Sequence, residues 1–248
     1  MVSTVSAMLA AGDTVAPLRA LIFLAVSQQL DGGFAQNFSV DGTPRAPGIQ
    51  LDEVAFPVLF AWQLERMKML QDFDPYPMIK RAATYLVTHG PVTGQERWEE
   101  TSGYSPSTLA ACIAALVGAG GFARNREDED SARFLEEYAD FLESHIEDWT
   151  VTTDGSLVPG ITRYYMRIQP EDVNNQNPVS DPNSKILKIA NGPPGVEDSF
   201  PARNVVDAGF LQLVRYGIRA PDDPLILDSL KVVDAMLKVE TPYYYSCR

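Results

Sequence analysis

The sequence predicts an all-α fold in which about four antiparallel helical hairpins pack side by side as an α/α toroid. Two observations support this prediction. Apolar residues recur with the i, i+3, i+4 spacing of one helix face in eight separate segments. The connections between these segments alternate between short and long, and each short connection joins two helices into an antiparallel hairpin. The long loops should then all leave the hairpins at the same end.

The helical segments are bounded by residues that begin or end helices. Gly12 and Gly90 follow the first and fourth segments, and the glycine-rich run 118–121 is expected to end the fifth. Asp223 is expected to cap the eighth helix, ahead of a proline in its first turn. The expected helices lie near residues 5–9, 18–26, 52–70, 75–89, 106–117, 130–149, 206–214 and 224–237.

Length and composition limit the possible classes of protein. A chain of 248 residues that is 45% hydrophobic can bury a substantial core. Its net charge of −13 argues against nucleic acid as a partner, because phosphate binding needs a clustered basic face, and it favours a neutral substrate. Cys112 and Cys247 do not suggest a disulfide framework, and neither a metal nor a cofactor is expected.

The sequence gives no sign of a membrane or export signal. No apolar run is expected to reach the roughly 18 residues of a membrane span, and the first residues lack the basic region of a signal peptide. We therefore expect no membrane partner. A cytoplasmic location is favoured, and secretion stays open.

Three long connections have the composition of loops, being rich in Gly, Pro, Asn and Asp. Each leaves an even-numbered helix and enters an odd-numbered one, so their ends are expected to converge on one rim, where a groove would be the binding site. A solenoid scaffold shares the hairpin pattern, but the unequal loops and the lack of a regular repeat count against it. The converging loop ends are residues 36–52, 95–104 and 200–207.

The second long loop carries two adjacent carboxylates beside an indole, in the run Arg97-Trp98-Glu99-Glu100. A carboxyl group that donates a proton near neutral pH needs a raised pKa, and an apolar wall and a like-charged neighbour both raise it. The run is therefore typical of half a catalytic site. A solvated acidic loop with a half-buried indole is an equal alternative from these residues alone.

Further motifs extend through nearly the whole chain: Gln36-Asn37-Phe38, Gly48-Ile49-Gln50-Leu51-Asp52-Glu53, Gly103-Tyr104-Ser105-Pro106-Ser107-Thr108, and Pro201-Ala202-Arg203 followed by Asp207-Ala208-Gly209-Phe210. Together with the Trp-Glu-Glu step they resemble the catalytic domain of the glucoamylase and glucodextranase family of glycoside hydrolases. The fold of that family is a six-hairpin barrel. The resemblance therefore implies that residues 1–248 form one partial catalytic domain, an incomplete (α/α)6 barrel without the first and last hairpins of the family fold.

The resemblance also implies roles for individual residues. Glu99 matches the general acid that protonates the leaving oxygen during inverting hydrolysis of α-glucosidic bonds from chain ends, so the implied partner is an α-glucan or oligosaccharide. Two positions where relatives often carry a stacking Trp are Ser39 and Ala46 here. Contacts to the sugar are implied for Trp98, Glu100, Gln50, Asp52, Arg203 and Asp207.

The general base of the family lies in a later hairpin, and no second carboxylate in this sequence is a convincing substitute. We therefore expect a truncated domain with weak or no activity, whose open barrel edge exposes apolar side chains and favours self-association. The main alternative is a non-catalytic carbohydrate-binding or scaffold domain. A terpene cyclase or prenyltransferase, suggested by the run 28–34, is disfavoured because that repeat occurs once and the zinc set of Cys, His and Asp is lacking. His145 is expected to be a helix-face residue.

Overall fold

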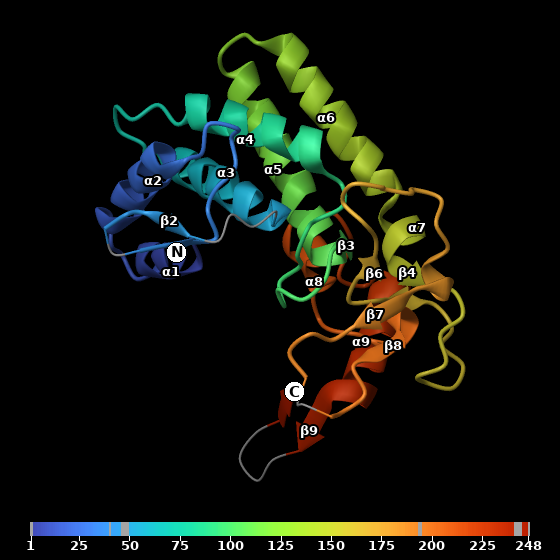
Figure 1. The fold of residues 1–248 in the computed structure, drawn as a ribbon. Helices are drawn as coiled ribbons and strands as arrows, with labels where there is room; N and C mark the ends of the chain where they lie inside the picture. The colour runs from blue at the N-terminus through green and yellow to red at the C-terminus, as the bar shows by residue number, and fades with distance from the viewer. Residues whose placement is uncertain (1, 40, 46–49, 193–194, 241–244, 248) are drawn as a thin grey trace. The chain divides into compact units, whose positions relative to one another are not determined.

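The computed structural model describes residues 2–39, 41–45, 50–192, 195–240 and 245–247. Ala46 and the residues Gly48 and Ile49 of the second motif lie outside this part of the chain. The described residues form helices joined by loops, with strands of only two or three residues, so the predicted all-α class is confirmed (Figure 1). The chain divides into two compact units, Met1–Pro91 with Ala111–Phe141, and Val92–Ala110 with Leu142–Arg248.

The first unit contains the two predicted N-terminal hairpins. Within it α1 packs on α2, α2 on α3 and α3 on α4, and the faces between them bury Leu21, Val58 and Ile79 completely (Figure 1). The prediction of these helices is confirmed, except that α3 ends at Arg66 rather than near residue 70. The elements are α1 (Val2–Ala10), α2 (Ala16–Ser27), α3 (Leu51–Arg66) and α4 (Tyr76–His89), with a short antiparallel pair of β1 (Asn37–Phe38) and β2 (Pro44–Arg45).

Two further helices, α5 (Pro106–Arg124) and α6 (Glu129–Ser144), contribute to both units. The prediction that α5 would stop at 118–121 is wrong, because the helix continues through these glycines. A Cβ atom at Gly121 would lie 2.8 Å from the ring of Trp62, so the missing side chain makes room for the indole. Packing against Trp62 therefore outweighs the weak helix propensity of glycine.

The full length of α5 also corrects the expectation about apolar runs. With 19 residues it is long and apolar enough, by length and composition alone, to cross a membrane. However, 83% of its most apolar window is buried within the protein. This burial is typical of a core helix.

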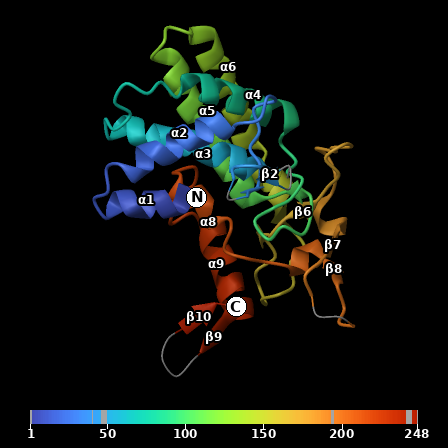
Figure 2. The same ribbon diagram turned by 60° about the vertical axis from the view of Figure 1, so that its left-hand side comes forward.

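The second unit combines short helices with antiparallel strand pairs (Figure 2). Tyr164 and Tyr165 form β5, and Asp223 caps α9 as predicted by accepting a hydrogen bond from the Leu225 amide at 2.8 Å. The helices are α7 (Ile146–Thr150), α8 (Leu211–Arg215) and α9 (Pro224–Leu237), with 3-10 turns at Pro182–Ser184 and Ala202–Asn204. The strand pairs are β3 (Gly103–Tyr104) with β6 (Gln169–Pro170), β4 (Val151–Thr152) with β5 (Tyr164–Tyr165), β7 (Ile186–Lys188) with β8 (Ser199–Pro201), and β9 (Lys238–Glu240) with β10 (Tyr245–Cys247).

Two further helix predictions are wrong. The helix expected over 130–149 is interrupted at His145, where α6 ends and α7 begins. The helix expected from residue 206 begins only at Leu211, because the side chain of Asp207 accepts hydrogen bonds from a loop and from the Gly209 amide. Asp207 therefore lies in a loop before α8 and does not cap it.

Buried aromatic rings form the core of the second unit. The ring of Trp149 stacks on Tyr104 at 4.7 Å and on His145 at 5.0 Å, which agrees with the expected structural role of His145. Tyr165 stacks on Phe210 at 5.4 Å. Tyr104 belongs to β3, so this core fixes the end of the loop that carries Trp98 and Glu99.

Candidate active site

The loop with the predicted catalytic residues is closed at its base by backbone pairing. Thr93 and Gly103 exchange two hydrogen bonds of 3.0 Å, and Gly103 continues into the β3–β6 pair. A Cβ atom at Gly103 would lie 2.1 Å from the carbonyl oxygen of Gln169, so only glycine permits this close approach of the two strands. The loop 94–102 is therefore held at both ends.

A buried carboxylate shapes the turn inside this loop. Glu96 is completely buried, its Oε2 accepts a hydrogen bond of 2.8 Å from the Trp98 amide, and its carbonyl oxygen accepts one of 2.7 Å from the Glu99 amide. Glu99 adopts a φ of 58°, in the left-handed region that costs free energy for a residue other than glycine. Its side chain is exposed and makes no hydrogen bond or ion pair with the described residues. The turn therefore presents this carboxylate to solvent.

The neighbouring indole is fixed at its polar edge. Nε1 of Trp98 donates a hydrogen bond of 2.8 Å to Oδ2 of Asp207, and Oδ1 of Asp207 accepts one of 2.7 Å from the Gly209 amide. Asp207 is buried, whereas 47% of Trp98 is exposed. The ring is thus held in place with much of its surface available to a ligand.

A buried arginine lies among the carboxylates of this loop. Nη2 of Arg167 is 2.8 Å from Oε2 of Glu100 and 3.5 Å from Oε1 of Glu96, and all three side chains are at most 8% exposed. Oε1 of Glu100 also accepts a hydrogen bond of 3.1 Å from the Asn191 amide. Both oxygens of Glu100 are therefore used to join the loop to Arg167 and to the connection between β7 and β8.

Burial changes the acidity of one carboxyl group in the cluster. Removal of Glu96 from water raises its pKa from 4.5 to about 7. The hydrogen bond from the Trp98 amide and the charge of Arg167 oppose this effect, and the negative charges of Asp207 and Glu100 add to it. Glu96 can therefore keep its proton near neutral pH.

A pocket of about 300 Å³ lies beside this cluster within the second unit, at the lower end of the size range of small-molecule sites. It combines an exposed indole, two guanidinium groups and a carboxylate with apolar side chains. Its lining residues are Arg97, Trp98, Arg167, Val205, Val206, Asp207, Ala208, Val233 and Leu237.

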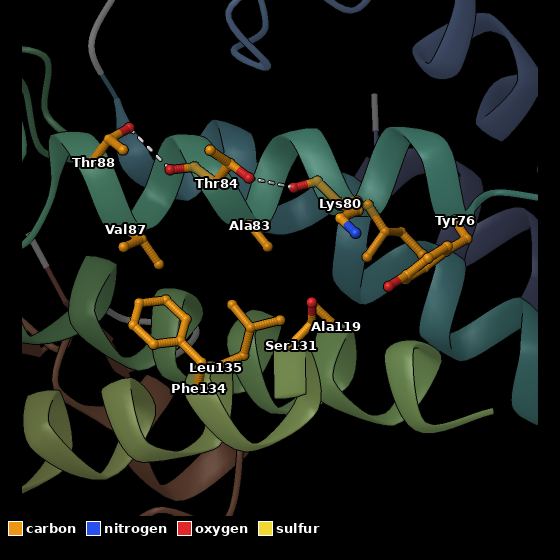
Figure 3. Close-up of a pocket in the computed structure, with 11 residues that line it drawn as sticks. Tyr76, Lys80, Ala83, Thr84, Val87, Thr88, Ala119, Ser131, Phe134 and Leu135 are labelled. Carbon is orange, nitrogen blue, oxygen red and sulfur yellow. Dashed lines mark hydrogen bonds between the residues drawn. The ribbon is translucent and has the colours of Figure 1, made fainter. Parts of the chain in front are cut away.

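The first unit contains a different pocket, of about 150 Å³, between α4 and α6 (Figure 3). Its walls are mainly apolar, with Phe134 and Leu135 facing α4. The hydroxyl groups of Thr84 and Thr88 donate to backbone carbonyl oxygens within α4. No carboxylate lines this pocket among the described residues, so it lacks the groups for acid catalysis.

The glycosyl hydrolases family 15 model matches residues 25–246. The chain belongs to this family. A glucoamylase from Clostridium sp. (strain G0005) is 41% identical over 239 residues, which cover 96% of this chain and 31% of that protein. A crystal structure of a bacterial glucoamylase complexed with acarbose matches 92% of this chain and 31% of its own, with a TM-score of 0.79 and 38% identity. The chain thus spans less than a third of the length of either relative.

Family membership confirms the predicted architecture. The fold belongs to the (α/α)6 barrel of family 15 glucoamylases, and the helical hairpins of this chain are an incomplete form of it. The expectation that the chain is one truncated catalytic domain stays a prediction.

The structure brings together four of the residues implied by the resemblance to family 15. Trp98, Glu99, Glu100 and Asp207 share one loop cluster in the second unit. Gln50 and Asp52 lie in the first unit at the start of α3, where Gln50 occupies the position before the helix and Asp52 is buried in its first turn. Substrate contacts by all of these residues stay predictions.

Arg203 lies in the second unit, on the 3-10 turn Ala202–Asn204. Its Nη1 donates a hydrogen bond of 2.7 Å to the carbonyl oxygen of Asn183 and lies 3.7 Å from Asp154. Among the described residues, no hydrogen bond or ion pair joins Arg203 to the loop 94–102, called the Trp98 loop below. The cation that pairs with the carboxylates of this loop is Arg167.

Two residues of this loop cluster were missed from the sequence, Glu96 and Arg167. Glu96 is only three residues from Glu99, but nothing in its neighbours predicts complete burial. Arg167 follows β5, and it is 67 residues away from Glu100 in the sequence, so the ion pair leaves no local signal. No cluster of three or more His, Cys, Asp or Glu side chains that could hold a metal ion occurs in the described part of the chain.

Proposed function

We propose that this family 15 chain takes part in the hydrolysis of α-glucosidic bonds, with Glu99 as the general acid of an inverting reaction. The observation that carries the proposal is the exposed carboxylate of Glu99, held at φ 58° next to an indole that lines a pocket. Non-glycine residues in this backbone region concentrate at functional sites. The bond between Asp207 and Trp98, together with the turn at Glu96, supplies the rigid support that such a site needs.

The pocket has the chemistry expected for a neutral sugar. The face of the Trp98 indole offers an apolar surface for the C–H groups of a pyranose ring, and the neighbouring guanidinium groups of Arg97 and Arg167 can donate hydrogen bonds to hydroxyl groups. We therefore propose an α-glucan or maltooligosaccharide as the substrate. The acarbose bound by the related bacterial glucoamylase supports this choice.

Inversion requires a second carboxylate roughly 6.5–9.5 Å from the acid, so that a water molecule fits between the base and the sugar. Both side-chain oxygens of Glu100 and of Asp207 accept hydrogen bonds from protein donors, and Glu96 is completely buried, so none of the three has a free oxygen that faces solvent water. We therefore assign the base to none of them, and our proposal gives this chain the acid half of the site. Little or no turnover is expected from the 248-residue chain alone.

Because none of these carboxyl groups is assigned as the base, a second candidate function is carbohydrate binding without hydrolysis. The pocket beside Trp98 would serve either function, because sugar stacking does not require the base. The two candidates differ in whether any glucose is released: the acid half of a hydrolase site predicts a slow release that depends on Glu99, whereas binding alone predicts none.

Substitution of Glu99 by Gln is expected to reduce any glucose release from maltotriose by at least about 100-fold, because loss of a general acid typically costs that much. Glucose formed by the purified chain and by the variant is measured enzymatically over hours. Glu137→Gln, an exposed position on α6, is the matched control and should leave the rate unchanged. Release well above the blank that Glu99→Gln does not reduce would contradict the assignment of the acid. Binding of maltotriose without release would favour the second candidate.

A further inference from the structure

The most deeply buried acidic group of the site takes no direct part in the reaction proposed above. Glu96 is 0% exposed, and its carboxyl group faces three charged residues, Arg167, Glu100 and Asp207. Its two oxygens are used differently. Oε2 accepts the Trp98 amide at 2.8 Å, whereas Oε1 has no hydrogen-bond partner among the described residues and lies 3.5 Å from Nη2 of Arg167.

The same nitrogen of Arg167 forms the 2.8 Å hydrogen bond to Glu100. One cation is therefore shared between two buried carboxyl groups, with the carboxylate of Asp207 as a third negative group nearby. Keeping all three acids ionised around one guanidinium group at this depth is unfavourable, because desolvation favours the neutral form of an acid. The shorter distance assigns Arg167 to Glu100, which leaves Glu96 as the group that keeps a proton.

We propose that Glu96 is a positioning residue that couples the proton on its own carboxyl group to the hold of Arg167 on Glu100. While Glu96 is protonated, Arg167 remains with Glu100, and Glu100 holds the Asn191 amide. When Glu96 loses its proton, its Oε1 becomes a competing anion 3.5 Å from Nη2, and the guanidinium group is drawn away from Glu100. The proton is exchanged with solvent, so no further reactant is needed.

The coupling reaches both sides of the proposed acid. On one side of Glu99, Glu96 fixes the turn by accepting hydrogen bonds from the Trp98 and Glu99 amides. On the other side, Glu100 is the residue directly after Glu99. A rise in pH is therefore expected to weaken the contact between Arg167 and Glu100, which follows Glu99, while the turn at Glu96, which precedes Glu99, persists. The raised pKa of Glu96, about 7, places this change near neutral pH.

Two backbone amides report the coupling separately. The Trp98 amide donates to Glu96, and the Asn191 amide donates to Glu100. In the chain labelled with ¹⁵N at Trp and Asn, both amide signals are expected to shift between about pH 5.5 and 8.5 with a common midpoint near 7. In Glu96→Gln both shifts should disappear, whereas in the control Glu137→Gln both should remain.

The titration of the unsubstituted chain is decisive even if Glu96→Gln fails to fold. A Trp98 signal that moves while the Asn191 signal stays constant would show a Glu96 that titrates without coupling, and would overturn the proposal. A Trp98 signal without a midpoint in that pH range would overturn it as well. This inference rests on the proposed function, because the coupling matters for catalysis only if Glu99 is the general acid. Because the titration contains no sugar, its failure is distinguishable from failure of the hydrolysis assay.

Discussion

Replacement of Arg167 by Met is expected to lower the free energy of unfolding by about 4 kcal/mol at pH 7. The guanidinium group is buried between Glu96 and Glu100, and its removal leaves Glu100 as a buried carboxylate without a cation. Methionine retains most of the apolar stem, and the backbone hydrogen bond from the Arg167 amide to Val205 is unaffected. Chemical denaturation followed by circular dichroism measures the effect.

The matched control is Arg133→Met on α6, where the ion pair with Asp130 has exposed fractions of 66% and 91%. An exposed pair of this kind contributes little, so a change below about 1 kcal/mol is expected. If Arg167→Met were as mild as this control, the buried charge cluster would not stabilise the loop, and our account of the site would be wrong.

Replacement of Glu96 by Gln is expected to remove a pH-dependent loss of stability. The folded chain holds the Glu96 proton up to about pH 7, whereas the unfolded chain releases it near 4.5. Between these values the folded state binds more protons, so its stability falls as the pH rises. Since each pKa unit is equivalent to about 1.4 kcal/mol, this group makes the fold about 3 kcal/mol less stable at pH 8 than at pH 4.

The side-chain amide introduced by Glu96→Gln can still accept the Trp98 hydrogen bond but has no proton to lose. Unfolding free energies of the native chain and of Glu96→Gln are therefore expected to be similar near pH 4.5 and to diverge in favour of the variant above pH 7. Comparison with Glu137→Gln removes the contribution of other titrating groups. A difference between the native chain and Glu96→Gln that stays the same across this pH range would contradict the raised pKa.

The helices were largely predictable because their apolar spacing is local. At two of the places where prediction was wrong, a contact from elsewhere in the chain decided the local structure. The glycines of α5 are helical because the indole of Trp62 packs against them. The start of α8 is delayed because the Asp207 side chain accepts a hydrogen bond from Trp98, 109 residues away. Neither contact leaves a periodic signal in the sequence.

The candidate site likewise has a part that could be predicted from the sequence and a part that could not. The run from Trp98 to Glu100 is contiguous, so its composition alone predicted a carboxylate beside an indole, and family motifs added Asp207. The sequence did not show which carboxyl group is buried. It indicated a raised pKa within the run Arg97-Trp98-Glu99-Glu100, whereas burial raises the pKa of Glu96 to about 7. Its depth comes from the closure of the loop by Thr93 and Gly103, and its partner Arg167 comes from a loop after β5. Residue types suggest which chemistry is available, whereas burial and ion pairing are visible only in the folded chain.

The central claim is that the Trp98 loop, with Asp207 behind it, is a sugar-binding surface next to the acid. Isothermal titration calorimetry with acarbose tests this claim directly on the native chain and on Trp98→Ala. We expect the native chain to bind and the variant to bind at least about tenfold more weakly, which corresponds to the loss of about 1.4 kcal/mol of stacking. Phe134→Ala, in the apolar pocket of the first unit, should bind like the native chain. Equal affinity of the native chain and Trp98→Ala, or no binding by either, would contradict the account.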